Sequence, residues 1–284
     1  MQWSGGALLV LTDEGTSTPG ITSLNREGRV MRATTFSIPG SALITIRDFA
    51  RATDGTIALS GSAADAGGRA ASFIASISTD GQNARVVRTG AYRPFRIAFD
   101  PDGTIWTVGY EELVPLPANA KTMSETLDPR ASVFRRFDRT GKQIGALVPQ
   151  SEIKYPVSLT SVTSVFGVVG SRIIWYSAPE GQYIELSRDG TVTNITELAL
   201  PNGGRENGFG LTEAGDLFLS SIGRRDWVLY KLDPAAHAWI SITQGPIGTV
   251  SRSNPPIVLY GADANLLVAG TDAIKLQFFN AGTN

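Results

Sequence analysis

A tight turn between two apolar runs recurs along this chain, and it constrains the fold more than any other feature of the sequence. In Pro94–Tyr110, the runs Phe95–Phe99 and Thr104–Val108 flank the turn Pro101-Asp102-Gly103. Asp-Gly between such runs predicts a β-hairpin, because glycine adopts positive φ without steric cost. Comparable turns end at Gly6, Gly55, Gly103, Gly170, Gly215 and Asn265. They recur about every 45 to 50 residues, with one longer interval, and such a period predicts a propeller or a solenoid.

A second kind of turn lies between these hairpins and joins more polar strands. Each period therefore contains four strands, an inner pair that is almost entirely apolar and an outer pair that alternates with Arg and Thr. Four-stranded antiparallel units that repeat radially are propeller blades. The sequence thus predicts an all-β fold, a single six-bladed β-propeller domain over residues 1–284. The copies of the second turn are Asn25–Gly28, Ser78–Gly81, Asp138–Gly141 and Ser187–Gly190, with a degenerate copy at Asp233–Ala236.

The one long interval contains residues Glu111–Arg130, which we expect to form an inserted loop. This stretch carries Pro115, Pro117 and Pro129 and has no strand periodicity. We expect it to lie outside the blade sheets and to be more mobile than they are. Because long loops in compact domains are commonly functional, it is the expected contact element of the molecule.

The two ends of the chain carry incomplete blades. The first blade shows no inner strand after Met1, and the last blade stops after a third strand at Ile274–Phe279. Without an inner strand, Ala7–Leu11 would present an unpaired apolar edge. We therefore expect native residues upstream of Met1 to supply the missing strands. The inner strands predicted within the chain are Ile46–Ala50, Phe95–Phe99, Ser161–Val165, Asn207–Leu211 and Ile257–Tyr260.

Composition narrows the classes of function. The net charge of −1 gives no attraction toward nucleic acid, so no nucleic-acid partner is expected. No apolar run reaches the length of about 18 residues that spans a bilayer, and no signal peptide is recognisable at the start of the chain. The chain has no Cys, which excludes disulfides and thiol chemistry, and a single His, His237, which leaves a catalytic triad without a suitable base.

Candidate ligand-binding residues follow from the blade alignment. Counting back seven residues from the inner turns aligns Asp48, Arg96, Thr163 and Gly208, which should ring the mouth of the central channel. An Arg-rich mouth predicts binding of an anionic or carboxylate-bearing group. A structural interpretation stands beside it, in which Asp48 and Arg96 on adjacent blades pair with each other. The predicted ligand-binding set is Arg47, Asp48, Arg93, Arg96, Arg205 and Asn207.

The pattern (A/F)-x-D-G-T-I-(W/A), followed by a D-x-x-G outer turn, resembles bacterial six-bladed propellers of the NHL and SMP-30/gluconolactonase-like group. The segment DPDGTIWTVG also resembles blades of the streptogramin-lyase type. The first resemblance implies a divalent cation such as calcium, bound in the channel. Asp48 and Asn207 offer oxygen ligands for it, whereas the positive charge of Arg96 would repel it. The second implies a catalytic His near the channel, whereas His237 follows the degenerate outer turn at the rim. The resemblance also implies a periplasmic or extracellular location.

The sequence leaves three function hypotheses. The first is a non-enzymatic propeller scaffold that binds a partner protein or a small anionic ligand on one face, without a cofactor. The alternative is a divalent-cation-dependent hydrolase or lyase of the six-bladed type. A structural role as one module of a larger envelope protein is a third possibility.

Overall fold

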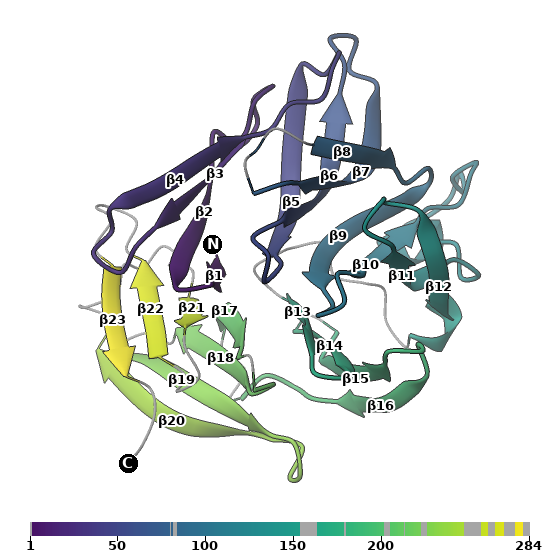
Figure 1. Cartoon of the computed structure of the whole chain (residues 1–284). Coiled ribbons are helices and arrows are strands. Elements are labelled where there is room, and N and C mark those ends of the chain that lie inside the picture. Colours follow the sequence, from purple (N-terminus) through teal and green to yellow (C-terminus); the bar gives the residue numbers. More distant parts are fainter. Residues whose placement is uncertain are drawn as a thin grey trace.

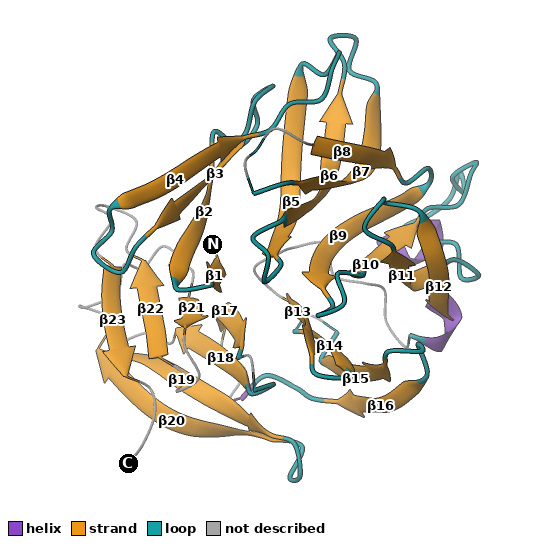
Figure 2. Ribbon diagram, in the orientation of Figure 1, coloured by secondary structure: helices purple, strands orange, loops and turns teal. Residues whose placement is uncertain are grey.

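The computed structural model describes residues 2–79, 81, 84–153, 164–178, 180–201, 205–212, 214–222, 226–246, 257–260, 265–269 and 276–280. These residues form an all-β propeller of antiparallel sheets arranged around a common centre (Figure 1). Strands dominate throughout (Figure 2), and helix is confined to short segments such as η1 (Met123–Thr126) and η2 (Gln150–Glu152). Within the described residues, no helix is long and apolar enough to cross a membrane.

Five sheets have four strands each and form complete blades. The first sheet contains β1 (Gln2–Ser4), β2 (Ala7–Thr12), β3 (Gly20–Leu24) and β4 (Val30–Thr35). The second contains β5 (Leu43–Arg51), β6 (Ile57–Ala64), β7 (Ala70–Ile77) and β8 (Ala84–Arg88). The third contains β9 (Tyr92–Phe99), β10 (Ile105–Glu111), β11 (Ser132–Phe137) and β12 (Gln143–Pro149).

The remaining sheets continue the ring. The fourth contains β13 (Ser164–Val169), β14 (Arg172–Ser177), β15 (Gln182–Ser187) and β16 (Val192–Glu197). The fifth contains β17 (Arg205–Leu211), β18 (Leu217–Ile222), β19 (Asp226–Asp233) and β20 (Ala238–Pro246). The sixth has three described strands, β21 (Ile257–Tyr260), β22 (Asn265–Ala269) and β23 (Leu276–Asn280). The prediction of four-stranded antiparallel blades is therefore confirmed for five sheets rather than six.

The inner strands are neighbours in the order β5, β9, β13, β17, β21 and β1. The first and second sheets are joined by an isolated bridge, in which the backbone N–H of Ile44 donates to the carbonyl of Thr16 at 2.8 Å. These contacts link each of the six sheets to the next, and the sheets lie around a common centre (Figure 1).

The prediction that the first blade lacks an inner strand within residues 1–284 is wrong. Its inner strand is β1, in which Gln2–Ser4 pairs with Ala7–Leu9. Gly5 and Gly6 both have positive φ, 56° and 75°, and they turn the chain between the two strands. The three residues of β1 contain too few apolar side chains to be recognised as a strand, and the structure shows that they cover the edge that was expected to be unpaired. Leu8 and Leu9 are buried accordingly.

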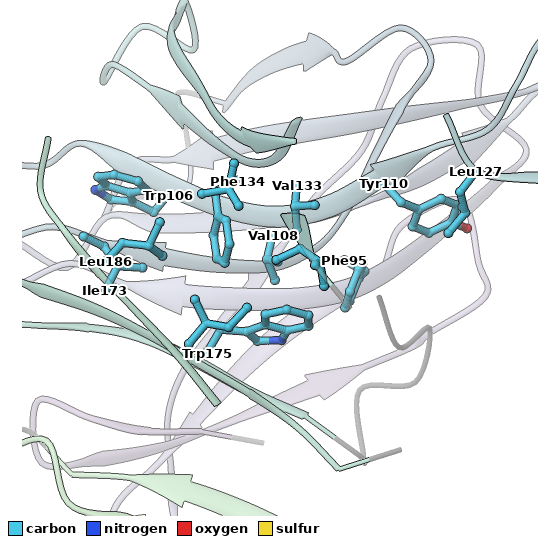
Figure 3. Close-up of a cluster of buried hydrophobic side chains, with 13 residues drawn as sticks. Phe95, Trp106, Val108, Tyr110, Leu127, Val133, Phe134, Ile173, Trp175 and Leu186 are labelled. Carbon is cyan, nitrogen blue, oxygen red and sulfur yellow. The ribbon is translucent and has the colours of Figure 1, made fainter. Parts of the chain in front are cut away.

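The hydrophobic core lies between adjacent blades rather than inside each one. Between the third and fourth sheets, Trp106 of β10 and Trp175 of β14 are both fully buried (Figure 3). Phe134 of β11 packs edge-on against Trp175, with ring centroids 5.9 Å apart. Because large aromatic side chains fill these seams, neighbouring blades are held at a fixed separation.

The insertion leaves the third sheet at the end of β10 and returns at β11. Its base is closed by backbone hydrogen bonds, from Leu113 to the carbonyl of Thr126 at 2.7 Å and from Asp128 to that of Glu111 at 2.9 Å. Apart from Glu111, the last residue of β10, this segment forms no blade strand in the described structure. Beyond the antiparallel bridge between Glu112 and Leu127 at its base, the segment adds no strand to a blade, and its relative mobility stays a prediction.

Candidate functional site

A β-bulge recurs on the inner strands, one residue before the positions that the count from the inner turns aligned. In the second sheet Ile46 pairs with Gly61 and Asp48 with Ser60, which leaves Arg47 as the extra residue. The same shift leaves Phe95 unpaired in β9 and Asn207 unpaired in β17. A bulge bends its strand and redirects the extra side chain. The count from the inner turns therefore places equivalent backbone positions together in the second, third and fifth sheets.

In β13 the alignment fails, because the hairpin there is shorter. Val169 pairs with Arg172 across two residues, whereas Arg51 pairs with Ile57 across five in the second sheet. Counting back from Gly170 consequently overshoots the matching position. The residue chosen, Thr163, lies outside the described residues, as does most of the predicted inner strand Ser161–Val165.

Asp48 and Arg96 form an ion pair across the seam between the second and third sheets. Arg96 Nη1 lies 3.5 Å from Asp48 Oδ1, and the side chains are only 11 % and 21 % exposed, respectively. The backbone N–H of Ile97 donates to Asp48 Oδ2 at 3.0 Å. Arg96 also donates from Nε to the hydroxyl of Ser164 at 3.1 Å, and from Nη2 to the carbonyl of the same residue. The pair that the structural interpretation predicts is present, and it ties three blades together.

Burial dominates the electrostatics of this pair. It raises the pKa of Asp48, although the Arg96 charge and the hydrogen bond from Ile97 oppose the change. Burial likewise lowers the pKa of Arg96, and Asp48 opposes that shift. Since the two charges compensate each other and are largely removed from water, they contribute more to orienting the blades than to recruiting a ligand.

A pocket of about 260 Å³ lies between the second and third sheets, and we call it the Arg47 pocket. It brings together Arg47 and Arg93, two residues of the predicted ligand-binding set. Its wall also includes the base of the insertion, through Glu112 and Val114. The full lining is Arg47, Ser62, Ala70, Ala71, Ser72, Gly90, Ala91, Arg93, Glu112 and Val114.

The two arginines of the Arg47 pocket differ in their partners. Arg93 Nη2 lies 2.7 Å from Glu112 Oε2, and its guanidinium lies 5.9 Å from the ring centre of Tyr110. Arg47 is half-buried and forms no ion pair with any residue that the structure describes. The pocket therefore carries one uncompensated positive charge beside a neutralised pair.

The six predicted residues thus separate into three groups. Arg47 and Arg93 share a pocket, and Asp48 and Arg96 pair away from it. The backbone of Arg205 and Asn207 belongs to β17, but their side chains lie outside the described residues. The sequence reasoning missed Ser164 as the anchor of Arg96. It also missed Glu112 as the partner of Arg93, although the acidic pair Glu111-Glu112 directly after an apolar strand was a visible signal.

The residues around Asp48 do not fit a divalent cation. Such ions need several converging oxygens without a neighbouring positive charge. The Asp48 carboxylate already faces Arg96 and accepts a backbone hydrogen bond. Elsewhere in the described part of the chain, no group of three or more His, Asp or Glu side chains is placed to hold a metal.

Comparison with known proteins supports the fold. No family model matches the chain, and no curated protein matches it. Among solved structures, a nidogen/laminin complex matches 97 % of this chain and 90 % of its own, with a TM-score of 0.58 and 16 % identity. A Bacteroides caccae protein of unknown function matches 93 % of this chain and 82 % of its own, with a TM-score of 0.53 and 9 % identity. A glucose dehydrogenase matches 100 % of this chain and 95 % of its own, with a TM-score of 0.52 and 13 % identity. At these identities the similarity shows that the chain has a β-propeller fold.

Proposed function

We propose that this chain is a non-enzymatic β-propeller scaffold that binds an acidic group of a protein partner in the Arg47 pocket. The observation that carries the proposal is Arg47, a half-buried arginine that has no acidic partner among the described residues and lines a pocket of about 260 Å³. A guanidinium in such a place recognises a carboxylate through paired, charge-assisted hydrogen bonds.

A protein partner is favoured over a small anion by the surface beside the pocket. Val114 and Leu116 of the insertion are 87 % and 56 % exposed, and Val114 lines the pocket itself. Exposed apolar side chains next to a cationic pocket suit a partner segment that places an apolar residue beside Asp or Glu. The matching propeller from a nidogen/laminin complex is an instance of this fold in a complex between proteins.

The ring is taken to have six blades, as in the NHL and SMP-30/gluconolactonase-like group. β21 is the inner strand of the sixth, three-stranded blade, and it lies between β17 and β1. Binding requires no metal under this proposal, because the carboxylate best placed to hold one, that of Asp48, is already paired with Arg96.

The test measures binding to an immobilised peptide in which Asp alternates with Leu, with succinate as the small anion. Arg47→Ala should weaken binding of both probes about tenfold, the loss expected for a charge-assisted hydrogen bond. Arg139→Ala is the matched control, since Arg139 is an exposed arginine on an outer turn of the third sheet. The paired change Val114→Ser and Leu116→Ser should weaken binding of the peptide only. Equal binding by the Arg47 and Arg139 variants, or no binding of either probe, contradicts the proposal.

A further inference from the structure

A second pocket, of about 220 Å³, lies between the fourth and fifth sheets, and we call it the Glu185 pocket. It is formed near the start of β14 and the turn from β19 to β20, at the opposite end of the strands from the Arg47 pocket. The lining is Arg172, Tyr183, Glu185, Asn194, Thr196, Leu198, Leu232, Pro234 and His237. Nothing in the proposed function uses this site.

The strand register builds one polar wall. Tyr183 pairs with Thr196, and Glu185 pairs with Asn194, across β15 and β16. Directly paired residues of antiparallel strands point to the same face of the sheet, so these four side chains form a compact array. They continue the face through which the fourth sheet packs on the fifth, where Leu198 and Leu232 are buried. The four polar side chains therefore border the apolar contact between the fourth and fifth sheets.

The opposite wall comes from the fifth sheet. The turn after β19 is fixed by Asp233, whose Oδ1 accepts backbone N–H bonds from Ala235 at 2.9 Å and from Ala236 at 3.1 Å. His237 follows with a positive φ of 49° and lines the pocket. The single His of the chain is thus at the rim, as predicted, and there it borders a pocket formed by two blades.

The charges inside the Glu185 pocket cancel. Arg172 Nη1 lies 3.1 Å from Glu185 Oε1, and the Tyr183 hydroxyl donates to the same oxygen. Burial and the contact with Glu185 raise the pKa of Tyr183, which therefore remains a protonated donor. An anionic guest that approached Arg172 would be repelled by Glu185, and a cationic guest that approached Glu185 would be repelled by Arg172. The pocket therefore favours a neutral guest.

Two polar groups are left to meet that guest. Both described bonds to the Glu185 carboxylate fall on Oε1, so among the described residues Oε2 has no donor. Thr196 donates to Asn194 Oδ1 at 2.8 Å, which leaves the Asn194 amide nitrogen as a donor without a described acceptor. A carboxylate oxygen beside an amide N–H₂ matches adjacent hydroxyl groups, which both donate and accept. Leu198, Leu232 and Pro234 supply an apolar surface for C–H groups.

From this arrangement we propose that the Glu185 pocket binds a neutral sugar ring. Its volume corresponds to about seven water molecules, which is enough for one ring and too small for a folded partner. Glu185 accepts from one hydroxyl and Asn194 donates to its neighbour. His237 contacts the ring from the side of the fifth sheet.

The experiment is saturation-transfer NMR on the whole chain with free glucose, galactose and N-acetylglucosamine as probes. At least one should bind in the millimolar range, and Asn194→Ala should weaken it about fivefold to tenfold, as expected for one lost hydrogen bond. Ile195→Ala is the matched control, since Ile195 lies on the same strand but is 44 % exposed on the other face. Near-ultraviolet circular dichroism verifies that each variant is folded.

Inorganic phosphate and ethylamine are titrated in parallel. Binding of phosphate or ethylamine in place of the sugars would overturn the proposal, as would the absence of binding by any sugar. Equal affinity in the Asn194 and Ile195 variants would place the sugar elsewhere and also overturn it. Arg47→Ala should leave sugar binding unchanged, so the result is independent of the proposed function of the Arg47 pocket.

Discussion

The guanidinium of Arg188 lies 2.6 Å from the carboxylate of Asp100, with Nη2 facing Oδ1. Asp100 belongs to the inner turn of the third sheet and Arg188 to the outer turn of the fourth, so the contact joins the two kinds of turn across a blade seam. The Asp100 side chain is only 2 % exposed, whereas that of Arg188 is 40 % exposed. The buried charge in this pair is therefore the carboxylate.

This asymmetry predicts unequal costs for breaking the pair. Arg188→Ala leaves a buried carboxylate without its cation and should lower the free energy of unfolding by about 3 kcal/mol. Asp100→Asn leaves only a partly exposed arginine and should cost about 1 kcal/mol. In the Arg188→Ala background, Asp100→Asn should restore part of the loss. Urea unfolding of the four proteins measures this, and simple additivity of the two changes would contradict it.

The Asp48–Arg96 pair predicts a dependence of stability on pH. Burial raises the pKa of Asp48 in the folded state above its ordinary value of 3.8. The folded protein therefore holds this proton more firmly than the unfolded chain does. The contribution of Asp48 to stability is fully present below about pH 3.8 and is lost as the pH rises through the folded pKa.

Asp48→Asn removes this titration while keeping the shape of the side chain. The stability of the unmodified protein relative to Asp48→Asn should therefore fall as the pH rises above about 4. Urea midpoints of both proteins from pH 4 to neutrality measure the difference. A relative gain by the unmodified protein over that range would show that Arg96, and not burial, dominates the pKa of Asp48.

The outer turn of the fourth sheet predicts a titration of the opposite sign. The Ser187 hydroxyl and the backbone N–H of Thr191, at 2.9 Å, both donate to Asp189 Oδ1. These bonds lower the pKa of Asp189 from 3.8 to about 2. The stabilisation is present above about pH 3.8 and is lost as the pH falls toward 2. Carboxyl NMR titration should show the low value and its return toward 3.8 in Ser187→Ala, and an unchanged value in that variant would contradict the assignment.

The sequence was sufficient to predict the blades because their signals are local. Asp-Gly turns and apolar runs predict hairpins such as β9–β10 without knowledge of distant residues. The same reasoning predicted that Asp48 and Arg96 could pair, since the alignment placed them on adjacent blades. It failed for β1, where Gln2–Ser4 pairs through backbone atoms and carries little apolar signal.

The contacts that shape the Arg47 pocket could not be predicted in the same way. Ion pairs such as Arg93 with Glu112 depend on how a loop folds back on its blade. The placement of β13 was wrong because turn length changes the register, and a glycine alone does not report that length. One further signal was available in the sequence, namely glycine inside an apolar strand, which indicates a bulge or a close backbone approach.

That signal leads to a prediction about Gly61 and Gly109, which both lie opposite the bulges of the inner strands. A Cβ on Gly61 would lie 2.2 Å from the carbonyl oxygen of Thr45, and one on Gly109 would lie 2.4 Å from that of Arg93. Neither contact can be relieved by a side-chain rotation, because both oxygens belong to the backbone. Gly61→Ala and Gly109→Ala should each destabilise the fold by about 1 to 3 kcal/mol.

Gly145→Ala is the matched control, since its Cβ would come no closer than 3.4 Å to the flexible side chain of Arg136 and the residue also lies in a strand. This change should be nearly neutral in urea unfolding. Gly109→Ala has a second expected effect, because displacing the backbone of Arg93 moves a wall of the Arg47 pocket. Gly61→Ala should share this effect, because it displaces the backbone beside Arg47, so both variants should weaken succinate binding while Gly145→Ala should not. If Gly61→Ala and Gly109→Ala unfolded at the same urea concentration as Gly145→Ala, the prediction would be wrong. The strands would then tolerate a side chain opposite the bulge.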